Sequence, residues 1–286
     1  MKEFFAALCG ILMLAASARA GVVVEEQQVS DRGGGAPITH KIVVMVQGNK
    51  QKSVIDDVKQ SLIIDLDQGM RMMISDARKM YVEVPFPSKG MPKGPNPTAI
   101  SFKKTGGTQT LAGYSCDEYT GAGSMNGNDM TIVGCFSSSA PGAQVFTNFQ
   151  KAMADKVKGT PMALMSDSPP GIPLKIDTTM KVTHMSMPGL TPQQMEEMNK
   201  RLAGRPPTVI HMTVTKVTEE NLAADTFQPP KGYTKQQMPM MAPGMMGARP
   251  PMGAAPGAMG QRPGSGAPVF GLPPQAPATP AGKVPE

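Results

Sequence analysis

The sequence has few of the residues from which metal centres and catalytic sites are built. Its three histidines are His40, His184 and His211, and none of them lies in a metal-ligand spacing such as His-x-x-x-His. No glycine-rich phosphate loop follows a predicted strand, since Gly33-Gly34-Gly35 and Gly106-Gly107 are typical of turns. We therefore expect no catalytic residue, no bound metal and no cofactor, and a protein that is not an enzyme.

Long apolar runs are also missing, except at the N-terminus. Phe4 to Ala16 is nearly all apolar, Lys2 precedes it, and Ala18-Arg19-Ala20 has a small-x-small pattern. The run is too short to span a bilayer as a permanent helix. Residues 1–20 are therefore predicted to be a secretory signal peptide cleaved after Ala20, and we expect a mature protein that is soluble in the periplasm. A lipoprotein signal that uses Cys9 is disfavoured, because almost no apolar segment would precede it.

Cysteine is scarce as well. The chain has three cysteines, of which signal cleavage removes Cys9 and leaves Cys116 and Cys135. An even number in an oxidising compartment favours a disulfide bond over two buried thiols. Both residues lie on the arms of one predicted hairpin. Opposed residues on paired strands come within the roughly 4.4–6.8 Å between Cα atoms that a disulfide requires.

Charge is nearly absent from the C-terminal part of the chain. Residues 237–286 consist mostly of methionine, proline, glycine and alanine. Prolines this frequent prevent a regular helix or strand, and few branched apolar side chains are present to form a core. We predict a disordered tail at 237–286, which leaves residues 21–236 as one β domain. The charges of residues 234–286 allow a weak peripheral contact with anionic lipid headgroups; they are Lys235, Arg249, Arg262 and Lys283 against Glu286.

Aliphatic residues and methionine are abundant, and they set the pattern of Gln60–Phe86. Three short runs alternate apolar and polar side chains with the period of two that is typical of β-strands. Their apolar members are Leu62, Ile64 and Leu66, then Met70, Met72 and Ile74, then Met80, Val82, Val84 and Phe86. A three-residue loop, Asp67–Gly69, would place Leu66 opposite Met70 and Leu62 opposite Ile74, so we expect one continuous apolar face. Asp65 alternates with Asp67, as exposed polar positions do.

The rest of the chain shows further strands and two helices. Strands are predicted at Val22–Ser30, Ile38–Gln47, Lys50–Asp56, Ile100–Lys104, Gln109–Thr120, Met130–Ser137, Ile172–Met187 and Thr208–Glu219, with a turn at Gly121–Asn128. Helical spacing is found in Pro141–Lys158, which Ser139 can cap, and in Thr191–Ala203. Strands therefore outnumber helices, and most connections between neighbouring strands are short.

Four segments within Val22–Gln236 give the chain a family resemblance. They are SLIIDLDQGMRMMISDARKMYVEV, KKTGGTQTLAGYSCDEYT, GIPLKID and the terminal FQPPKGYTK. In this order they resemble a bacterial exported domain, domain of unknown function 4412, whose fold is similar to that of the lipoprotein carriers LolA and LolB. Those carriers are half-open antiparallel barrels whose concave side is covered by helices and accepts acyl chains. Such domains often have a tryptophan-bearing strand after the cysteine strand. This sequence departs from that pattern, because it reads MTIVGCFSS there and contains no tryptophan.

Pattern and resemblance together predict an α+β fold that is mainly β. We expect one strongly curved antiparallel half-barrel of roughly eight to eleven strands, similar to LolA and LolB. The helices Pro141–Lys158 and Thr191–Ala203 should lie on its concave face. The side chains predicted to line a ligand cavity are Leu62, Ile64, Leu66, Met70, Met72, Ile74, Met80, Val82, Val84, Phe146, Phe149, Met153, Met180, Val182, Met195 and Met198.

Three functions stay open on the sequence. The favoured one is a non-enzymatic periplasmic carrier for an apolar or amphiphilic ligand, such as an acyl chain, a lipid or a lipoprotein. One alternative is an envelope structural or interaction protein with a closed core. The other is a periplasmic copper-binding protein, because the 26 methionines include the clusters Met238–Met246 and His184–Met187, and thioethers favour Cu(I). Nucleic acid is not an expected partner of an exported chain, although the formal net charge is +6.

Overall fold

The computed structural model describes residues 20–33, 35–86, 98–125, 128–158, 160, 167–182 and 191–237. The chain divides into two units, Met1–Gln237 and Met238–Glu286, and every described residue belongs to the first. The predicted signal peptide before Ala20, the predicted tail beyond Gln237 and the His184–Met187 cluster lie outside the described residues. Within the described ranges, no helix is both long and apolar enough to cross a membrane.

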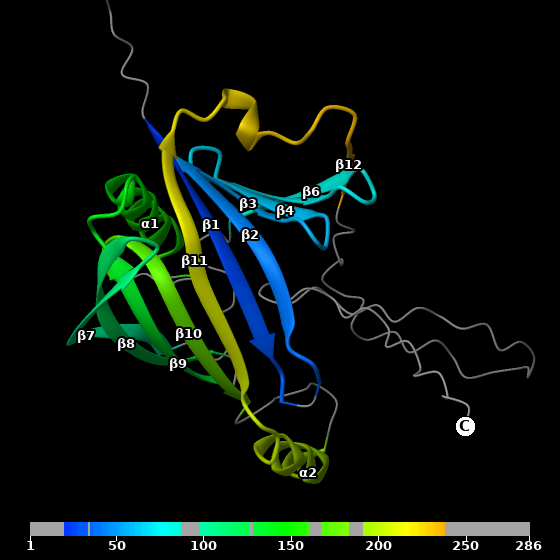
Figure 1. Ribbon diagram of the computed structural model, residues 1–286. Helices are drawn as coiled ribbons and strands as arrows, with labels where there is room; N and C mark the ends of the chain where they lie inside the picture. Colours follow the sequence, from blue (N-terminus) through cyan, green and yellow to red (C-terminus); the bar gives the residue numbers. More distant parts are fainter. Residues whose placement is uncertain are drawn as a thin grey trace, which may run out of the picture. The chain divides into compact units, whose positions relative to one another are not determined.

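Twelve strands form one sheet in this part of the chain. They are β1 (Gly21–Asp31), β2 (Ile38–Gln47), β3 (Lys50–Ile55), β4 (Gln60–Asp65), β5 (Met70–Ser75), β6 (Met80–Pro85), β7 (Thr98–Leu111), β8 (Tyr114–Met125), β9 (Asn128–Ser137), β10 (Ile172–Val182), β11 (Thr208–Glu220) and β12 (Thr234–Gln236). Their order is β12-β6-β5-β4-β3-β2-β1-β11-β10-β9-β8-β7. Two meanders, β1–β6 and β7–β11, are thus joined where β1 pairs with β11, and Figure 1 shows the curvature of the sheet.

Two α-helices and a short 3-10 helix complete the described fold. They are α1 (Ala143–Val157), α2 (Pro192–Ala203) and η2 (Ala224–Phe227). α1 lies against β1, β2 and β10. α2 touches β10 but buries none of its own residues, and Figure 1 shows it beside the end of β10 and the start of β11. The predicted fold class, mainly β with a curved antiparallel sheet and two helices, is confirmed. The strand β12, which pairs in parallel with β6, was not predicted.

The two faces of the sheet carry separate apolar clusters, and we name them the inner and the outer face. The inner face is the side covered by α1, where Val22 and Val24 pack with Phe149. The outer face holds a smaller cluster, in which Ile63 packs with Phe227 of η2. Since side chains along a strand alternate between faces, the register of each pair decides which cluster a residue joins.

The turn between β4 and β5 corrects the prediction of one continuous apolar face. It spans four residues, Leu66–Gly69, and sets Leu62 opposite Met73 rather than Ile74. The predicted pairing of Leu66 with Met70 is wrong for the same reason: one more loop residue shifts the register by one and turns the next strand's side chains over. Three residues that were predicted to share a face with Leu62 therefore lie on the outer face: Met70, Met72 and Ile74.

Asp65 is buried, although its alternation with Asp67 predicted an exposed position. Its side chain is within 3.0 Å of Lys50 Nζ, across the β3–β4 pair. Its Oδ1 atom also accepts a hydrogen bond of 2.9 Å from the backbone N–H of Gln68. Lys50 and the Gln68 N–H thus satisfy the buried carboxylate of Asp65. The bond to Gln68 also fixes the turn that sets the register of β5.

Glycines within β7 and β8 are placed differently from the prediction. The chain turns at Ala112-Gly113, where both φ angles are positive, and β8 continues to Met125. The predicted turn at Gly121–Asn128 is therefore wrong at its start. Gly121 lies inside β8, where a Cβ atom would come within 2.8 Å of the Ile100 side chain, so packing against β7 favours glycine at this position. Gly106-Gly107, also predicted as a turn, lies inside β7, where the pairing with β8 is irregular.

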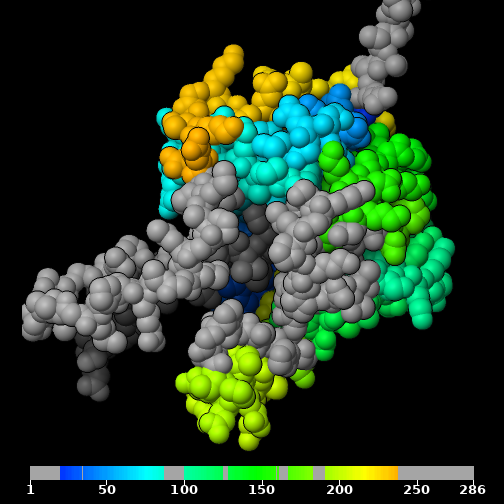
Figure 2. Space-filling view, turned by 180° about the vertical axis from the view of Figure 1, so that it is seen from behind, coloured from blue at the N-terminus to red at the C-terminus, as the bar shows by residue number. Residues whose placement is uncertain are grey.

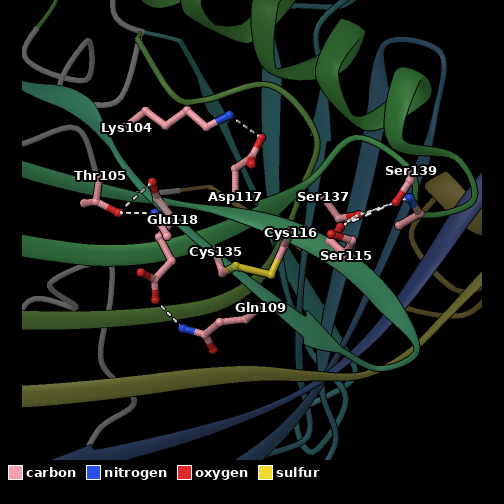
Figure 3. The surroundings of a disulfide bond; sticks show 12 residues. Lys104, Thr105, Gln109, Ser115, Cys116, Asp117, Glu118, Cys135, Ser137 and Ser139 are labelled. Atoms are coloured by element: carbon pink, nitrogen blue, oxygen red, sulfur yellow. Dashed lines mark hydrogen bonds and ion pairs between the residues drawn. A yellow bond between two sulfur atoms is a disulfide. The ribbon is translucent and has the colours of Figure 1, made fainter.

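The structure joins Cys116 and Cys135 in a disulfide bond, with 5.4 Å between their Cα atoms. The two cysteines are diagonal on the β8–β9 pair, because the residue across from Cys135 is Glu118. Both sulfurs lie in the inner-face cluster. The bond therefore closes the hairpin from within the core (Figure 3).

Ser137, next to this disulfide, fixes the approach to α1. Its hydroxyl donates to the Ser115 carbonyl at 2.6 Å and accepts from the Ala140 N–H at 3.2 Å, as Figure 3 shows in part. The residue that caps α1 is Gly142, in the left-handed conformation and without a side-chain hydrogen bond. Ser139, which was predicted to cap the helix, instead lies 3.2 Å from the Ser137 hydroxyl. α2, by contrast, begins as predicted, with a capping box between Thr191 and Gln194.

Candidate functional site

The inner face is tightly packed where α1 covers it. Phe149 is 3% exposed there, and Ile172 and Leu174 of β10 are fully buried. Thr147 of α1 donates its hydroxyl to the Ala143 carbonyl and accepts the Gly171 N–H, both at 2.8 Å. The helix is therefore bonded to the start of β10, and this end of the inner face is a filled core.

Beyond α1, the inner face carries many apolar side chains that are only partly buried. Half-buried aliphatic and methionine side chains there come from strands of both meanders: Ile55, Leu62, Met73, Met80, Val82, Val84, Ile176, Met180, Val182, Ile210 and Met212. Figure 2 shows blue atoms of the first strands at depth, between the cyan strands β3–β6 and the green α1 region. This partly buried area is the candidate ligand-binding face.

A carboxyl group interrupts this apolar area on β1. The register places Glu26 on the inner face, opposite Ile42 of β2 and Val214 of β11, both of which are buried. Burial raises the pKa of Glu26 to about 7, because the charged form loses its hydration among these neighbours. The described residues offer this carboxyl no hydrogen-bond or ion-pair partner. Glu26 therefore changes its charge near neutral pH.

A buried histidine lies on the next strand. His40 of β2 is 4% exposed, and its Nδ1 atom is 2.5 Å from Asp57 Oδ2 in the β3–β4 turn. Its other ring nitrogen, Nε2, is buried and has no hydrogen-bond partner among the described residues. Asp57 thus fixes the orientation of the ring and leaves one nitrogen for a further interaction.

One arginine also lies on this face. Arg71 of β5 is placed there by its pairing with Ile64 and Val84. Its guanidinium lies 5.7 Å from the centre of the Phe86 ring, and burial lowers its pKa. The stacking holds Arg71 at the β5–β6 side of the face.

The structure brings most of the predicted lining residues together. The inner face receives Leu62, Ile64, Leu66, Met80, Val82, Val84, Met180 and Val182, with Phe146, Phe149 and Met153 of α1 packed against the same cluster. Met70, Met72 and Ile74 belong to the outer face, as described above. Met195 and Met198 are half-buried on α2, which lies apart from α1. That the inner-face residues line a ligand cavity stays a prediction.

Sequence reasoning missed Glu26, His40, Met73 and Met212. The signal for Glu26 is present in the first strand, whose alternate residues Val22 and Val24 are followed by Glu26 at the same period. His40 likewise stands at the same period as Ile42, Val44 and Val46, but its partner Asp57 could not be predicted, because that residue lies in a turn whose position depends on the β2–β3–β4 register. Among the described residues, no three histidine, cysteine, aspartate or glutamate side chains are grouped so that they could hold a metal ion. The methionine clusters proposed for copper lie outside these residues.

Comparisons with known proteins find only distant similarity. No family model matches the sequence, and no curated protein matches it. Similar solved structures include PNGF-II, with 14% identity, a TM-score of 0.38 and coverage of 77% of this chain and 31% of that one. This chain thus spans less than a third of the PNGF-II chain.

Two smaller proteins are similar over most of their length. An uncharacterised conserved protein from Thermus thermophilus has 8% identity and a TM-score of 0.38, with 78% of this chain and 93% of that one covered. A LolA superfamily protein from Nitrosomonas europaea has 7% identity and a TM-score of 0.29, with 73% and 90% covered. The resemblance to domain of unknown function 4412 has no matching family model. At these TM-scores the similarities assign neither a ligand nor an activity.

Proposed function

We propose that this protein is a non-enzymatic carrier that binds the alkyl chain of an amphiphile on the inner face of its sheet. The observation that supports this most is the set of aliphatic and methionine side chains beyond α1, which lie on a curved face and stay half-buried. Apolar side chains that a fold gathers on one face and leaves incompletely covered commonly serve to bind a partner or a ligand.

The chemistry of the face suits a flexible unbranched chain. Met73, Met80, Met180 and Met212 come from four different strands. Thioether side chains are flexible and polarisable, so they adapt to apolar ligands of varied shape. Each methylene that the face removes from water contributes about 0.8 kcal/mol, so an acyl chain, a lipid or the lipid anchor of a lipoprotein could be held largely by burial.

The cell envelope is the compartment in which we expect this function. The apolar N-terminal segment Phe4–Ala16 supports export, and the buried Cys116–Cys135 disulfide fits an oxidising compartment. A ligand that is poorly soluble in water needs a carrier to cross such a compartment. The expected location is therefore consistent with a face that binds apolar ligands.

Displacement of a neutral apolar dye tests the proposal. Octanol, decanol and dodecanol would be titrated against N-phenyl-1-naphthylamine bound to the full mature chain. We expect the dissociation constant to fall about three- to fourfold with each added methylene, since about 0.8 kcal/mol is gained per group. Dye that is not displaced, or displacement without dependence on chain length, would favour the alternative of a closed core.

A pair of neighbouring substitutions on β10 locates the binding face. Met180 lies on the inner face and Thr179 on the outer face. Met180→Asp should weaken decanol binding about tenfold or more, because a carboxylate in the apolar area must be desolvated. Thr179→Asp adds the same group to the other side and should change the dissociation constant by less than about twofold. Equal effects of the two substitutions would place the ligand elsewhere.

A further inference from the structure

We propose that Glu26 and His40 form the polar end of the binding face and hold the ammonium group of an alkylamine-type amphiphile. The inference rests on the proposed function, because the two residues lie on the same face as the apolar side chains that would bind the alkyl chain. It adds the class of headgroup, a primary ammonium, to that function.

Glu26 is placed where a cation would be stabilised. Its neighbour in sequence, Glu25, faces outward and pairs with Lys216 Nζ at 3.2 Å. Glu26 faces inward between the buried Ile42 and Val214, and no cation of the described residues approaches it. A carboxylate in such surroundings loses hydration without gaining an ionic partner. A bound ammonium would supply that partner.

His40 provides the second acceptor. Because its Nδ1 atom is 2.5 Å from Asp57, a neutral ring that donates from Nδ1 presents the lone pair of Nε2. That atom is buried and has no hydrogen-bond partner within the described part of the chain. An N–H of the ligand would satisfy it.

The two acceptors are close enough to share one headgroup. Glu26 is opposite Ile42 and His40 is opposite Gln28, so Glu26 and His40 are diagonal neighbours on the inner face. Diagonal neighbours of an antiparallel pair are about 7–8 Å apart at their Cα atoms. An ammonium has three N–H donors and can therefore bond to both groups across this gap. The half-buried Met212 of β11, opposite Gln28, continues the apolar surface beside them.

An anionic headgroup is the competing ligand. Arg71 lies on the same face, near β6, and could attract a carboxylate. However, its guanidinium already stacks on Phe86, and an anion near Glu26 would meet a like charge. The position of Glu26 and His40 therefore favours a cation, and the comparison of headgroups below decides between the two.

Three decyl compounds with different headgroups test the proposal. Decylamine, decanol and decanoate would be titrated into the full mature chain with dye displacement as the readout. We expect decylamine to bind about 10- to 100-fold more tightly than decanol, the range of a hydrogen bond to a charged group, and decanoate to bind most weakly. Equal binding of the three would overturn the headgroup site and leave the apolar site standing. No binding of any would overturn the proposed function itself.

Substitution of adjacent glutamates provides the matched control. Glu26→Gln should bring the dissociation constant of decylamine within about threefold of that of decanol. Glu25→Gln removes the same charge from the outer face and should keep the full preference for the amine. His40→Gln should also reduce the preference for decylamine over decanol. An amine preference that survives Glu26→Gln, or is lost equally in Glu25→Gln, would overturn the proposal.

The pH dependence gives an independent readout. Burial raises the pKa of Glu26 to about 7, so decylamine affinity should be highest above pH 7 and fall by up to about tenfold per pH unit below it. On the neighbouring elements, β2 contributes His40 with Asp57, β11 contributes the uncharged Val214 and Met212, and the charged α1 residues Lys151, Asp155 and Lys156 are exposed. A pH profile that is unchanged in Glu26→Gln would contradict the role of Glu26.

Discussion

At the scale of single residues, the alternation of a strand decides the chemistry of two identical side chains. Glu25 and Glu26 are neighbours on β1, yet one faces Lys216 and the other faces buried valine and isoleucine side chains. The outward glutamate is half-exposed and forms an ion pair with Lys216. The inward one exchanges hydration for an apolar environment, so its ionisation opposes folding.

The first prediction concerns the stability of Glu26→Gln. The pKa of Glu26 is raised from 4.5 to about 7, so the unfolded state ionises first as the pH rises. The folded state therefore loses stability between about pH 4.5 and pH 7, and the loss is constant above pH 7. Glu26→Gln should be more stable than the native chain above pH 7, by on the order of 2 to 3 kcal/mol, and equal to it near pH 4. Urea unfolding at several pH values measures this, and a difference that does not change with pH would contradict it.

Individual polar residues were the hardest to predict from the sequence. Asp65 looks exposed by its alternation with Asp67, but it is buried because Lys50 and the Gln68 N–H satisfy its carboxylate. His40 follows the period of the apolar residues of β2, but its partner Asp57 comes from the β3–β4 turn and leaves no mark in the local sequence. Burial of a polar group depends on partners distant in sequence, whereas an aliphatic residue needs only a face, so the apolar pattern was the better guide.

At the scale of elements, α1 depends on one glycine at the start of β10. Gly171 has a φ angle of 104° and donates its N–H to Thr147 of the helix. A Cβ atom at this position would collide with the Ser137 carbonyl. We expect Gly171→Ala to lower the free energy of unfolding by about 2 kcal/mol or more. Thermal unfolding compared with Gly35→Ala, where a Cβ meets nothing within 4 Å, checks this. Equal stability of the two variants would show that α1 tolerates the change.

The β8–β9 hairpin depends on its disulfide. Cys116 and Cys135 are separated by 19 residues in sequence and both are buried in the inner-face cluster. The double substitution Cys116→Ala and Cys135→Ala should lower the free energy of unfolding by about 2 to 4 kcal/mol, because the unfolded chain is no longer constrained. Urea unfolding with and without reductant measures the effect. Reductant should destabilise the native chain and leave the double variant unchanged, and an unaffected native chain would argue against the bond.

Element positions followed the sequence wherever periodicity and turn chemistry agreed. The strands of Gln60–Phe86 and the capped helix α2 are present as predicted, because each has a clear period and a clear boundary. Register was less predictable. Leu66 belongs to the turn rather than to β4, and this one residue reversed the faces of β5. The glycines of β7 and β8 were wrongly predicted to form turns. Gly121 is required by close packing against β7, and Gly106-Gly107 lies where the β7–β8 pairing is irregular.

At the scale of the whole described chain, the last segment covers the outer face. Phe227 of η2 is 5% exposed against Ile63, Met72 and Ile74. Tyr233 then bonds to Asp76 at 3.0 Å, and β12 adds to β6. We expect Phe227→Ala to lower the free energy of unfolding by about 3 to 5 kcal/mol, because it leaves a cavity over this cluster.

The exposed neighbour Asp225 of the same 3-10 helix supplies the control for Phe227. Asp225→Ala should change the free energy of unfolding by less than about 0.5 kcal/mol. Chemical denaturation of both variants makes the comparison. A small effect of Phe227→Ala would mean that the outer-face cluster contributes little to stability.

The overall architecture was only partly accessible from the sequence. Local hairpins reveal themselves by alternation and turn residues, so the strands of the first meander could be predicted. In the second meander, the predicted strand Gln109–Thr120 is wrong, because the chain turns at Ala112-Gly113 between β7 and β8. The pairing of β1 with β11, and the parallel addition of β12 to β6, join residues far apart along the chain and leave no local pattern. For the same reason the apolar inner face was predicted, but not the polar pair Glu26 and His40 within it.

The seam between β1 and β11 has a consequence for how the molecule is made. Thr215 bonds to the Glu25 carbonyl across 190 positions of sequence, so the middle of the sheet cannot close until nearly the whole domain has been synthesised. Each meander can assemble early from contacts between successive strands. The pairing of β1 with β11 forms later, because it must overcome the loss of conformational entropy on closing a very large loop. This delay would favour export, because a polypeptide can pass through a translocation pore only while its central strands are still unpaired.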